Sequence, residues 1–386
     1  MFDVTRVRFK KYLVKSIVIF TWLCSLNAIS SPITLDISYV KLAKQQVAGT
    51  SNYFKKPADS GFQGAKLAIS DSNTTGKFLQ QHFNLSYFLA NKTPQLLEYL
   101  DGQYQQGQRI FMLDVPLAQL VQLERWAKNK SVLLFNVSET ADELRNSQCL
   151  SSVLHTIPSD AMKSDALAQW LLYRRMNKVL MVQGSNPEDV LLAKSFKRAA
   201  KRFGLKIIDE KQWDFNTDLR RSAQQEIPLF TQTVKDYDVV YVANKSKSFA
   251  EFLPFNTYLP RPVIGSAGLE ALAWHSVIEQ WGATQLQNRF IEMADRKMNE
   301  LDFSAYLAVR SVAESVHKLH TNASNELIEY INSVDFELAA YKGRKLSFRP
   351  WNRQLRMPLA LVHPHALVSQ SPQPGMLHPI TELDTL

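Results

Sequence analysis

The sequence has little cysteine and lacks the short motifs of common catalytic sites. Two cysteines in 386 residues exclude a disulfide-rich scaffold and a cysteine-built metal site. The absence of GxGxxG after the first strand, and of GxxxxGK(S/T), HExxH, GxSxG and CxxC, leaves dinucleotide, nucleotide, zinc-protease and serine-hydrolase functions unsupported. Hydrophobic residues make up 45% and charged residues 21%, which excludes disordered and low-complexity classes. At about 150 residues per domain, two folded domains are expected.

The first thirty residues are typical of an export signal. Ala28, Ile29 and Ser30 place small residues where a signal peptidase cuts, after an apolar stretch over 12–26 and the basic residues Arg6, Arg8, Lys10, Lys11 and Lys15. The apolar run from Ser16 to Leu26 is much shorter than the roughly 20 residues that span a bilayer. A signal peptide over 1–30, cleaved near Ser30, is therefore favoured over an anchor, and export to the periplasm is expected.

Removing this leader also changes the charge and the cysteine count. It takes away five basic residues and Asp3, which lowers the net charge from +9 to +5. The remaining basic residues are scattered and form no stripe that would follow a phosphate backbone, so no nucleic-acid partner is expected. Cys149 is then the only thiol, and a buried structural cysteine is favoured over a nucleophile paired with His155.

The stretch from Lys178 to Glu210 is the clearest structural unit. An apolar run of strand length precedes a Gly-Ser-Asn-Pro turn at 184–187, and an amphipathic helix then ends before Gly204. This pattern predicts a strand–helix–strand crossover in a parallel sheet. Similar apolar runs predict strands over 33–40, 83–89, 109–115, 132–137, 153–156, 237–243 and 262–265.

The pattern changes after residue 265. It predicts long helices over 271–290, 304–319 and 325–333, and then antiparallel strands over 336–341, 346–351 and 359–362. Residues 61–73 fit a helix or a strand, and 73–76 resembles a helix exit. The chain is therefore predicted to be an α/β protein. Because it has no Gly/Ser linker, we expect its two domains to be interwoven.

Polar residues follow several of the predicted parallel strands. Ligands bind at these carboxyl ends in open α/β sheets. Lys245 belongs to this group of strand-end residues, although each of them also suits a helix cap. The ligand-binding candidates are Asp114, Ser138, Thr140, Asp142, Asn186, Asn244 and Ser266.

Other candidates for chemistry are weaker. His363 and His365 could both bind a metal, but Pro364 restricts them and no carboxylate follows at helical spacing, so a surface loop is favoured and a metal site stays open. The tryptophans in periodic contexts are expected in the core or between domains, namely Trp170, Trp213, Trp274, Trp281 and Trp351.

Several longer segments resemble a known family. They are GAKLAI (64–69) with NTTG (73–76), DELR (142–145) before Cys149, LHTIPS (154–159) with DALAQ (165–169), EQWGATQLQNRF (279–290), KGR (342–344) with SFRPW (347–351), and TELDTL (381–386). The chain resembles type I periplasmic solute-binding proteins, the branched-chain amino-acid class of ABC receptors. Within that class it is similar to substrate-binding proteins associated with pyrroloquinoline-quinone (PQQ)-dependent alcohol dehydrogenase systems.

The resemblance implies two interwoven Rossmann-like lobes with parallel sheets and a ligand cleft between them. One lobe would combine 31–155 with 268–330, the other 156–267 with 331–386, with hinges near 156–159 and 265. The implied partners are a small-molecule or metal-chelate ligand, an ABC permease of the inner membrane and a PQQ-dependent dehydrogenase system, with no cofactor.

The ligand and the role stay open at this stage. An organic acid, an alcohol metabolite, a quinone-related molecule, and a metal ion or chelate are all candidates. A branched-chain or other amino acid is an alternative, although the family's usual carboxylate is missing from 265–267, which reads Gly-Ser-Ala. A non-transport accessory or sensor of the dehydrogenase system is the competing role, and an enzyme is the least favoured.

Overall fold

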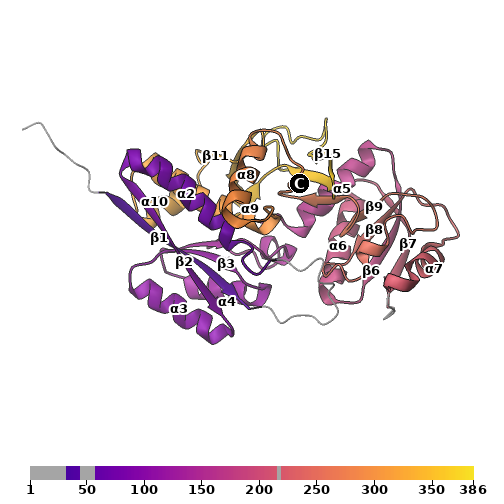
Figure 1. Cartoon of the computed structure of the whole chain (residues 1–386), viewed down its shortest axis with the longest axis horizontal. Coiled ribbons are helices and arrows are strands. Elements are labelled where there is room, and N and C mark those ends of the chain that lie inside the picture. The colour runs from indigo at the N-terminus through magenta and orange to yellow at the C-terminus, as the bar shows by residue number, and fades with distance from the viewer. Residues whose placement is uncertain (1–31, 44–56, 215–218) are drawn as a thin grey trace, which may run out of the picture.

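Two lobes lie side by side in the computed structural model, which describes residues 32–43, 57–214 and 219–386 (Figure 1). The expected signal peptide lies outside the described residues. Within the described ranges, no helix combines the length and the apolar character needed to cross a membrane.

The first lobe is built on a parallel five-stranded sheet in the order β2-β1-β3-β4-β5. β3 and β4 are buried at every position, as expected for central strands covered on both faces. Its strands are β1 (Ile33–Leu42), β2 (Gln81–Ala90), β3 (Ile110–Asp114), β4 (Leu133–Asn136) and β5 (Val153–His155), and its helices include α2 (Phe62–Leu79), α3 (Thr93–Gln105) and α4 (Leu117–Ala127).

The second lobe is built on a parallel four-stranded sheet in the order β7-β6-β8-β9. The predicted crossover is confirmed as β6, α6 and β7. Its strands are β6 (Lys178–Gly184), β7 (Lys206–Trp213), β8 (Val239–Ala243) and β9 (Val263–Gly265), and its helices include α5 (Asp160–Tyr173), α6 (Pro187–Arg202) and α7 (Leu219–Thr231).

The C-terminal third of the chain contributes to both lobes. α9 packs on α2 in the first lobe, whereas β14 and β15 contact α5 in the second (Figure 1). The elements after residue 265 are β10 (Glu270–Leu272), α8 (Ala283–Ala294), α9 (Glu300–Leu319), α10 (Ser324–Ile331), β11 (Leu338–Ala339), β12 (Lys345–Phe348), β13 (Leu355–Arg356), β14 (Leu359–His363) and β15 (Ala366–Ser371). The chain therefore crosses between the lobes repeatedly, as an interwoven architecture requires.

Close backbone contact joins α9 to α2. A Cβ atom on Gly64 would lie 1.9 Å from the carbonyl oxygen of Asp302, so only glycine fits there. The Asp302 carboxylate accepts from the backbone N–H of Gly61 at 2.7 Å and forms a capping box with Asn299. Glycine and a buried acid thus fix the two helices together.

Two of the predicted helix boundaries are wrong. The predicted helix over 271–290 begins only at Ala283, because Glu270–Leu272 pairs with β14 as an antiparallel strand. The predicted exit at 73–76 is also wrong, because α2 continues to Leu79. The Asn73 side chain does not end the helix but exchanges hydrogen bonds with the backbone of Phe83 on β2.

Three burial predictions are also wrong. Cys149 is exposed, in the loop after the 3-10 turn η2 (Asp142–Arg145), with its thiol 3.4 Å from the carbonyl oxygen of Trp351. Trp281 is 46% exposed and Trp351 58% exposed. The other three tryptophans named above are buried as predicted. The three errors share a cause, since loops place these side chains and periodicity carries no information about loops.

Candidate ligand site between the lobes

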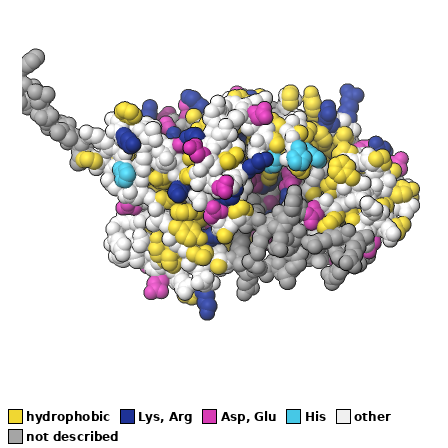
Figure 2. All heavy atoms as spheres, viewed as in Figure 1, with side chains coloured by type: hydrophobic (Ala, Val, Ile, Leu, Met, Phe, Trp, Pro, Cys, Tyr) yellow, Lys and Arg dark blue, Asp and Glu magenta, His cyan; other side chains and the backbone are white. Residues whose placement is uncertain are grey.

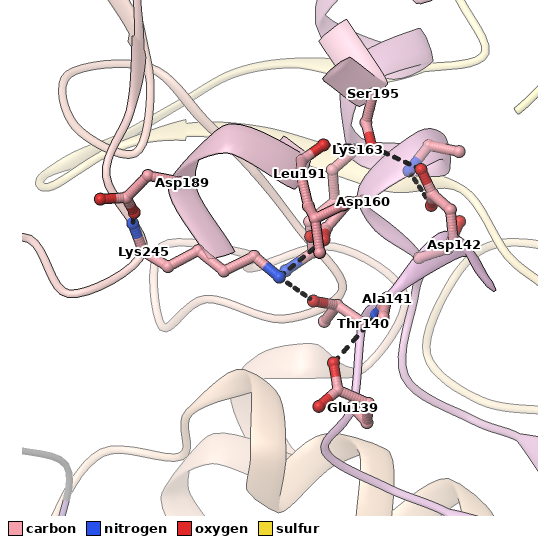
Figure 3. Close-up of polar contacts among 12 residues, drawn as sticks. Glu139, Thr140, Ala141, Asp142, Asp160, Lys163, Asp189, Leu191, Ser195 and Lys245 are labelled. Atoms are coloured by element: carbon pink, nitrogen blue, oxygen red, sulfur yellow. Dashed lines mark hydrogen bonds and ion pairs between the residues drawn. The ribbon is translucent and has the colours of Figure 1, made fainter. Parts of the chain in front are cut away.

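A lysine links the two sheets at their carboxyl ends. Lys245 follows β8 in the second lobe, and its ammonium donates to the hydroxyl of Thr140, which follows β4 in the first lobe, at 3.0 Å. The same ammonium lies 2.6 Å from the carboxylate of Asp160 at the start of α5 (Figure 3). We call Lys245, Thr140 and Asp160 the inter-lobe triad. The structure thus brings Thr140, a predicted candidate, together with a lysine of the opposite lobe.

The loop that carries Thr140 is fixed against the first turn of α5. The backbone N–H of Asp160 donates to the Thr140 carbonyl at 2.9 Å. The Asp142 carboxylate accepts from the N–H of Ala161 at 2.7 Å and from the hydroxyl of Ser195 on α6. Burial raises the pKa of Asp142, although both hydrogen bonds act in the opposite direction. Asp142 was predicted as a ligand contact. In the structure, each of its carboxylate oxygens accepts a hydrogen bond from a helix of the second lobe.

A buried arginine, Arg145, forms hydrogen bonds with the backbone of the same loop. The Arg145 guanidinium donates to the carbonyls of Glu139, Ala141 and Ile157, and to the Gln354 side chain. Burial lowers its pKa to about 10. Because its donors reach both Glu139 and Ala141, Arg145 fixes the backbone on either side of Thr140.

Asn244 and Ser266 shape the loop that carries Lys245. The buried Asn244 side chain accepts from the N–H groups of Phe249 and Ala250, and the backbone N–H of Asn244 donates to Ser266 Oγ at 2.9 Å. Asn186 lies nearby at the exposed start of α6 and donates to Asp189 at 3.4 Å. These three predicted candidates are close to Lys245 in the fold, and the first two position its loop.

A backbone hydrogen bond fixes Lys245 so that its side chain crosses from the second lobe to the first. Its N–H donates to Asp189 Oδ1 at 2.6 Å, and its side chain extends from there toward Thr140 (Figure 3). Burial acts to lower the pKa of Lys245, but Asp160, with Glu139 and Glu188, raises it above its ordinary value. The ammonium therefore stays charged near neutral pH.

Ser138 is a predicted candidate whose buried hydroxyl is not used within the described residues. Its hydroxyl is enclosed and finds no hydrogen-bond partner among the described residues. Its backbone N–H donates to Asn136 at 3.2 Å. A buried hydroxyl without a partner is costly, and a bound ligand would satisfy it.

Asp114 belongs to a second cluster in the first lobe. Its carboxylate accepts from the Tyr39 hydroxyl at 3.3 Å and lies 3.5 Å from the Lys41 ammonium. Tyr39 packs in turn against Phe62 and Tyr87, whose ring centroids are 4.9 Å apart. Sequence reasoning missed these aromatic residues, because only the fold places them beside Asp114.

Metal ligation has little support in the described part of the chain. No group of three or more histidine, cysteine, aspartate or glutamate side chains there is arranged to hold a metal ion. His363 and His365 lie at the turn between β14 and β15.

On the face seen in Figure 2, basic side chains are interspersed with acidic ones and form no continuous stripe.

Solved structures with the same architecture identify the fold, although no protein-family model and no curated protein matches the sequence. A branched-chain amino-acid ABC transporter periplasmic ligand-binding protein from Burkholderia xenovorans superposes with a TM-score of 0.69 at 15% identity, over 92% of this chain and 96% of its own. The leucine-, isoleucine-, valine-, threonine- and alanine-binding protein of Brucella ovis, in a closed conformation, has a TM-score of 0.67 at 13% identity, over 85% and 89%.

A third neighbour carries an aromatic acid. The solute-binding protein of an ABC transporter from Rhodopseudomonas palustris, in complex with 3,4-dihydroxybenzoic acid, has a TM-score of 0.63 at 13% identity, over 85% of this chain and 92% of its own. The molecule is thus a two-lobed α/β protein with parallel sheets and polar loops that meet between the lobes. Its fold is that of the type I periplasmic binding proteins, as the sequence predicted.

Proposed function

We propose that the protein is a periplasmic receptor that binds a small solute between its lobes and delivers it to an ABC permease of the inner membrane. The observation that carries the proposal is the inter-lobe triad, in which charged and hydroxyl groups of both lobes converge at the carboxyl ends of the sheets. A ligand held there touches both lobes, so its binding energy favours one relative orientation of them. The signal peptide expected over 1–30 supports a location in the periplasm.

The lobes and the biological setting are further parts of this proposal. We assign 31–155 with 268–330 to one lobe and 156–267 with 331–386 to the other. The segments that resemble receptors of PQQ-dependent alcohol dehydrogenase systems support a solute of alcohol oxidation, such as an organic acid or a metal chelate. A bare cation is disfavoured because Asp114 and Asp142 already hold internal donors.

Thermal unfolding of the purified protein with a ligand panel tests the proposal. The panel contains amino acids, aromatic and aliphatic acids and alcohols, and calcium and lanthanide salts. A ligand at about 100 times its Kd adds about 2.7 kcal/mol of stability, so the melting temperature rises clearly. We expect this rise with organic acids.

A different result points to the competing role. If no compound shifts the transition and the protein co-purifies stably with a dehydrogenase, it is an accessory protein and not a receptor. A shift with a lanthanide salt alone would contradict the organic ligand.

A further inference from the structure

The inter-lobe triad contains a positive charge of its own, the Lys245 ammonium. Lys245 is anchored by its own backbone N–H on Asp189, so its ammonium has a fixed starting point. Its side chain is 22% exposed, so the protein does not enclose it fully. The fold therefore holds the Lys245 ammonium in a defined position, unlike a lysine on the open surface.

Hydrogen-bond donors remain available on this cation and in the loop that carries Thr140. An ammonium has three N–H donors, and within the described residues two of them are used, on Thr140 and Asp160. The enclosed Ser138 hydroxyl, two residues before Thr140, also has a proton to donate. The third ammonium N–H and the Ser138 hydroxyl are therefore both donors that an oxygen acceptor of a ligand would satisfy.

The three aspartates near Lys245 are already held by internal donors. Asp160 pairs with Lys245, and Asp189 accepts from the Lys245 and Asn244 N–H groups. Asp142 is held by Ala161 and Ser195, and Glu139 accepts from the N–H of Ala141 at 3.0 Å. A ligand amine would lie beside the like charge of Lys245, and Asp160, Asp189 and Asp142 are already held by internal donors, so its binding in a partly buried site would be costly.

We propose that Lys245 determines specificity, and that the site takes a small organic acid without an amino group, whose carboxylate pairs with the Lys245 ammonium beside the Thr140 and Ser138 hydroxyls. The inference rests on the proposed receptor function and names its substrate class. It separates this protein from a receptor for zwitterionic amino acids.

Ligands that differ only in the head group test the inference by calorimetry. One set is 4-methylpentanoate, leucine and isoamylamine, and a second is 3-phenylpropionate, phenylalanine and 3-phenylpropanol. We expect at least one of the two acids to bind, and the matched amino acid, amine or alcohol to bind at least tenfold more weakly.

Two substitutions in one loop then isolate the lysine. Lys245→Gln should weaken acid binding at least tenfold. Lys247→Gln is the matched control, because Lys247 lies two residues away and pairs with Glu270 at 2.6 Å, outside the triad. Its affinity for the acid should stay within twofold of the unchanged protein.

A double variant separates recognition from structure. Lys245→Gln leaves Asp160 buried without its cation, whereas Lys245→Gln with Asp160→Asn removes both charges. We expect the double variant to fold and still lack acid binding. Full affinity in the double variant would mean that Lys245 only neutralises Asp160, and would overturn the inference.

The remaining outcomes distinguish this inference from the receptor function. If an amino acid binds more tightly than its matched acid, the inference is wrong and the receptor stands. If no compound of either set or of the wider panel binds, the receptor proposal fails together with it.

Discussion

At the scale of single residues, Lys342 is a buried lysine whose surroundings perturb its pKa. It is buried, its ammonium donates to the carbonyl of Ala273, and it lies 5.1 Å from the ring centroid of Phe303. Burial lowers its pKa from 10.5 to about 7, although Glu300 acts to raise it. A lysine in this state destabilises the fold when it is charged.

The sign of its pH dependence follows from this lowered pKa. Between pH 7 and 10 the unfolded chain holds the Lys342 proton and the folded chain does not, so stability rises with pH by at most about 1.4 kcal/mol per unit. We expect the free energy of unfolding, relative to Lys342→Met, to increase over this range in urea titrations. A constant difference between the two proteins from pH 7 to 10 would contradict the buried, neutral lysine.

Sequence reasoning found positions at the carboxyl ends of the strands more easily than it found the contacts of the side chains there. Thr140, Asn244 and Ser266 follow parallel strands, and local pattern was enough to find them. The local sequence around Asp142 could not show that its carboxylate bonds to Ala161 and Ser195, because both partners come from helices of the other lobe, and its contact with a ligand stays a prediction. The pairing of Lys245 with Asp160 joins residues 85 positions apart, and no local pattern encodes it.

At the scale of elements, the contact between α2 and α9 depends on Gly64. Gly64→Ala should destabilise the protein by about 3 kcal/mol or more, because the added methyl group would overlap the backbone of Asp302. Gly102→Ala is the control, since its Cβ would meet nothing within 4 Å inside α3. The control should be neutral or up to about 1 kcal/mol more stable.

Urea unfolding followed by circular dichroism measures both variants. Equal stability of Gly64→Ala and Gly102→Ala would show that α2 and α9 can separate without loss, against the close packing described above.

The errors among the elements also have a physical cause. Strands β1, β3, β4 and β6 were predictable because their apolar runs are local. Residues 270–272 form a strand only because β14, about 90 residues later, supplies its hydrogen-bond partner. Helix periodicity was visible in that segment, and tertiary pairing overrode it.

At the scale of the whole molecule, neither lobe is complete without the C-terminal third. A chain ending at residue 282 would lack α8 and α9 on α2, and β14 and β15 against α5. We expect this truncated protein to show no cooperative unfolding transition by tryptophan fluorescence in urea, whereas the full chain shows one. A cooperative transition in the truncated chain would mean that one lobe folds alone.

The hydrogen bond from Gly61 N–H to Asp302 also sets a delay during synthesis. The two residues are 241 positions apart. At about 5–20 residues per second, roughly 10–50 s pass between the emergence of one and of the other from the ribosome. During that time α2 can pack against β2 but lacks α9. The first lobe consequently acquires this helix–helix packing only after residue 302 has been synthesised.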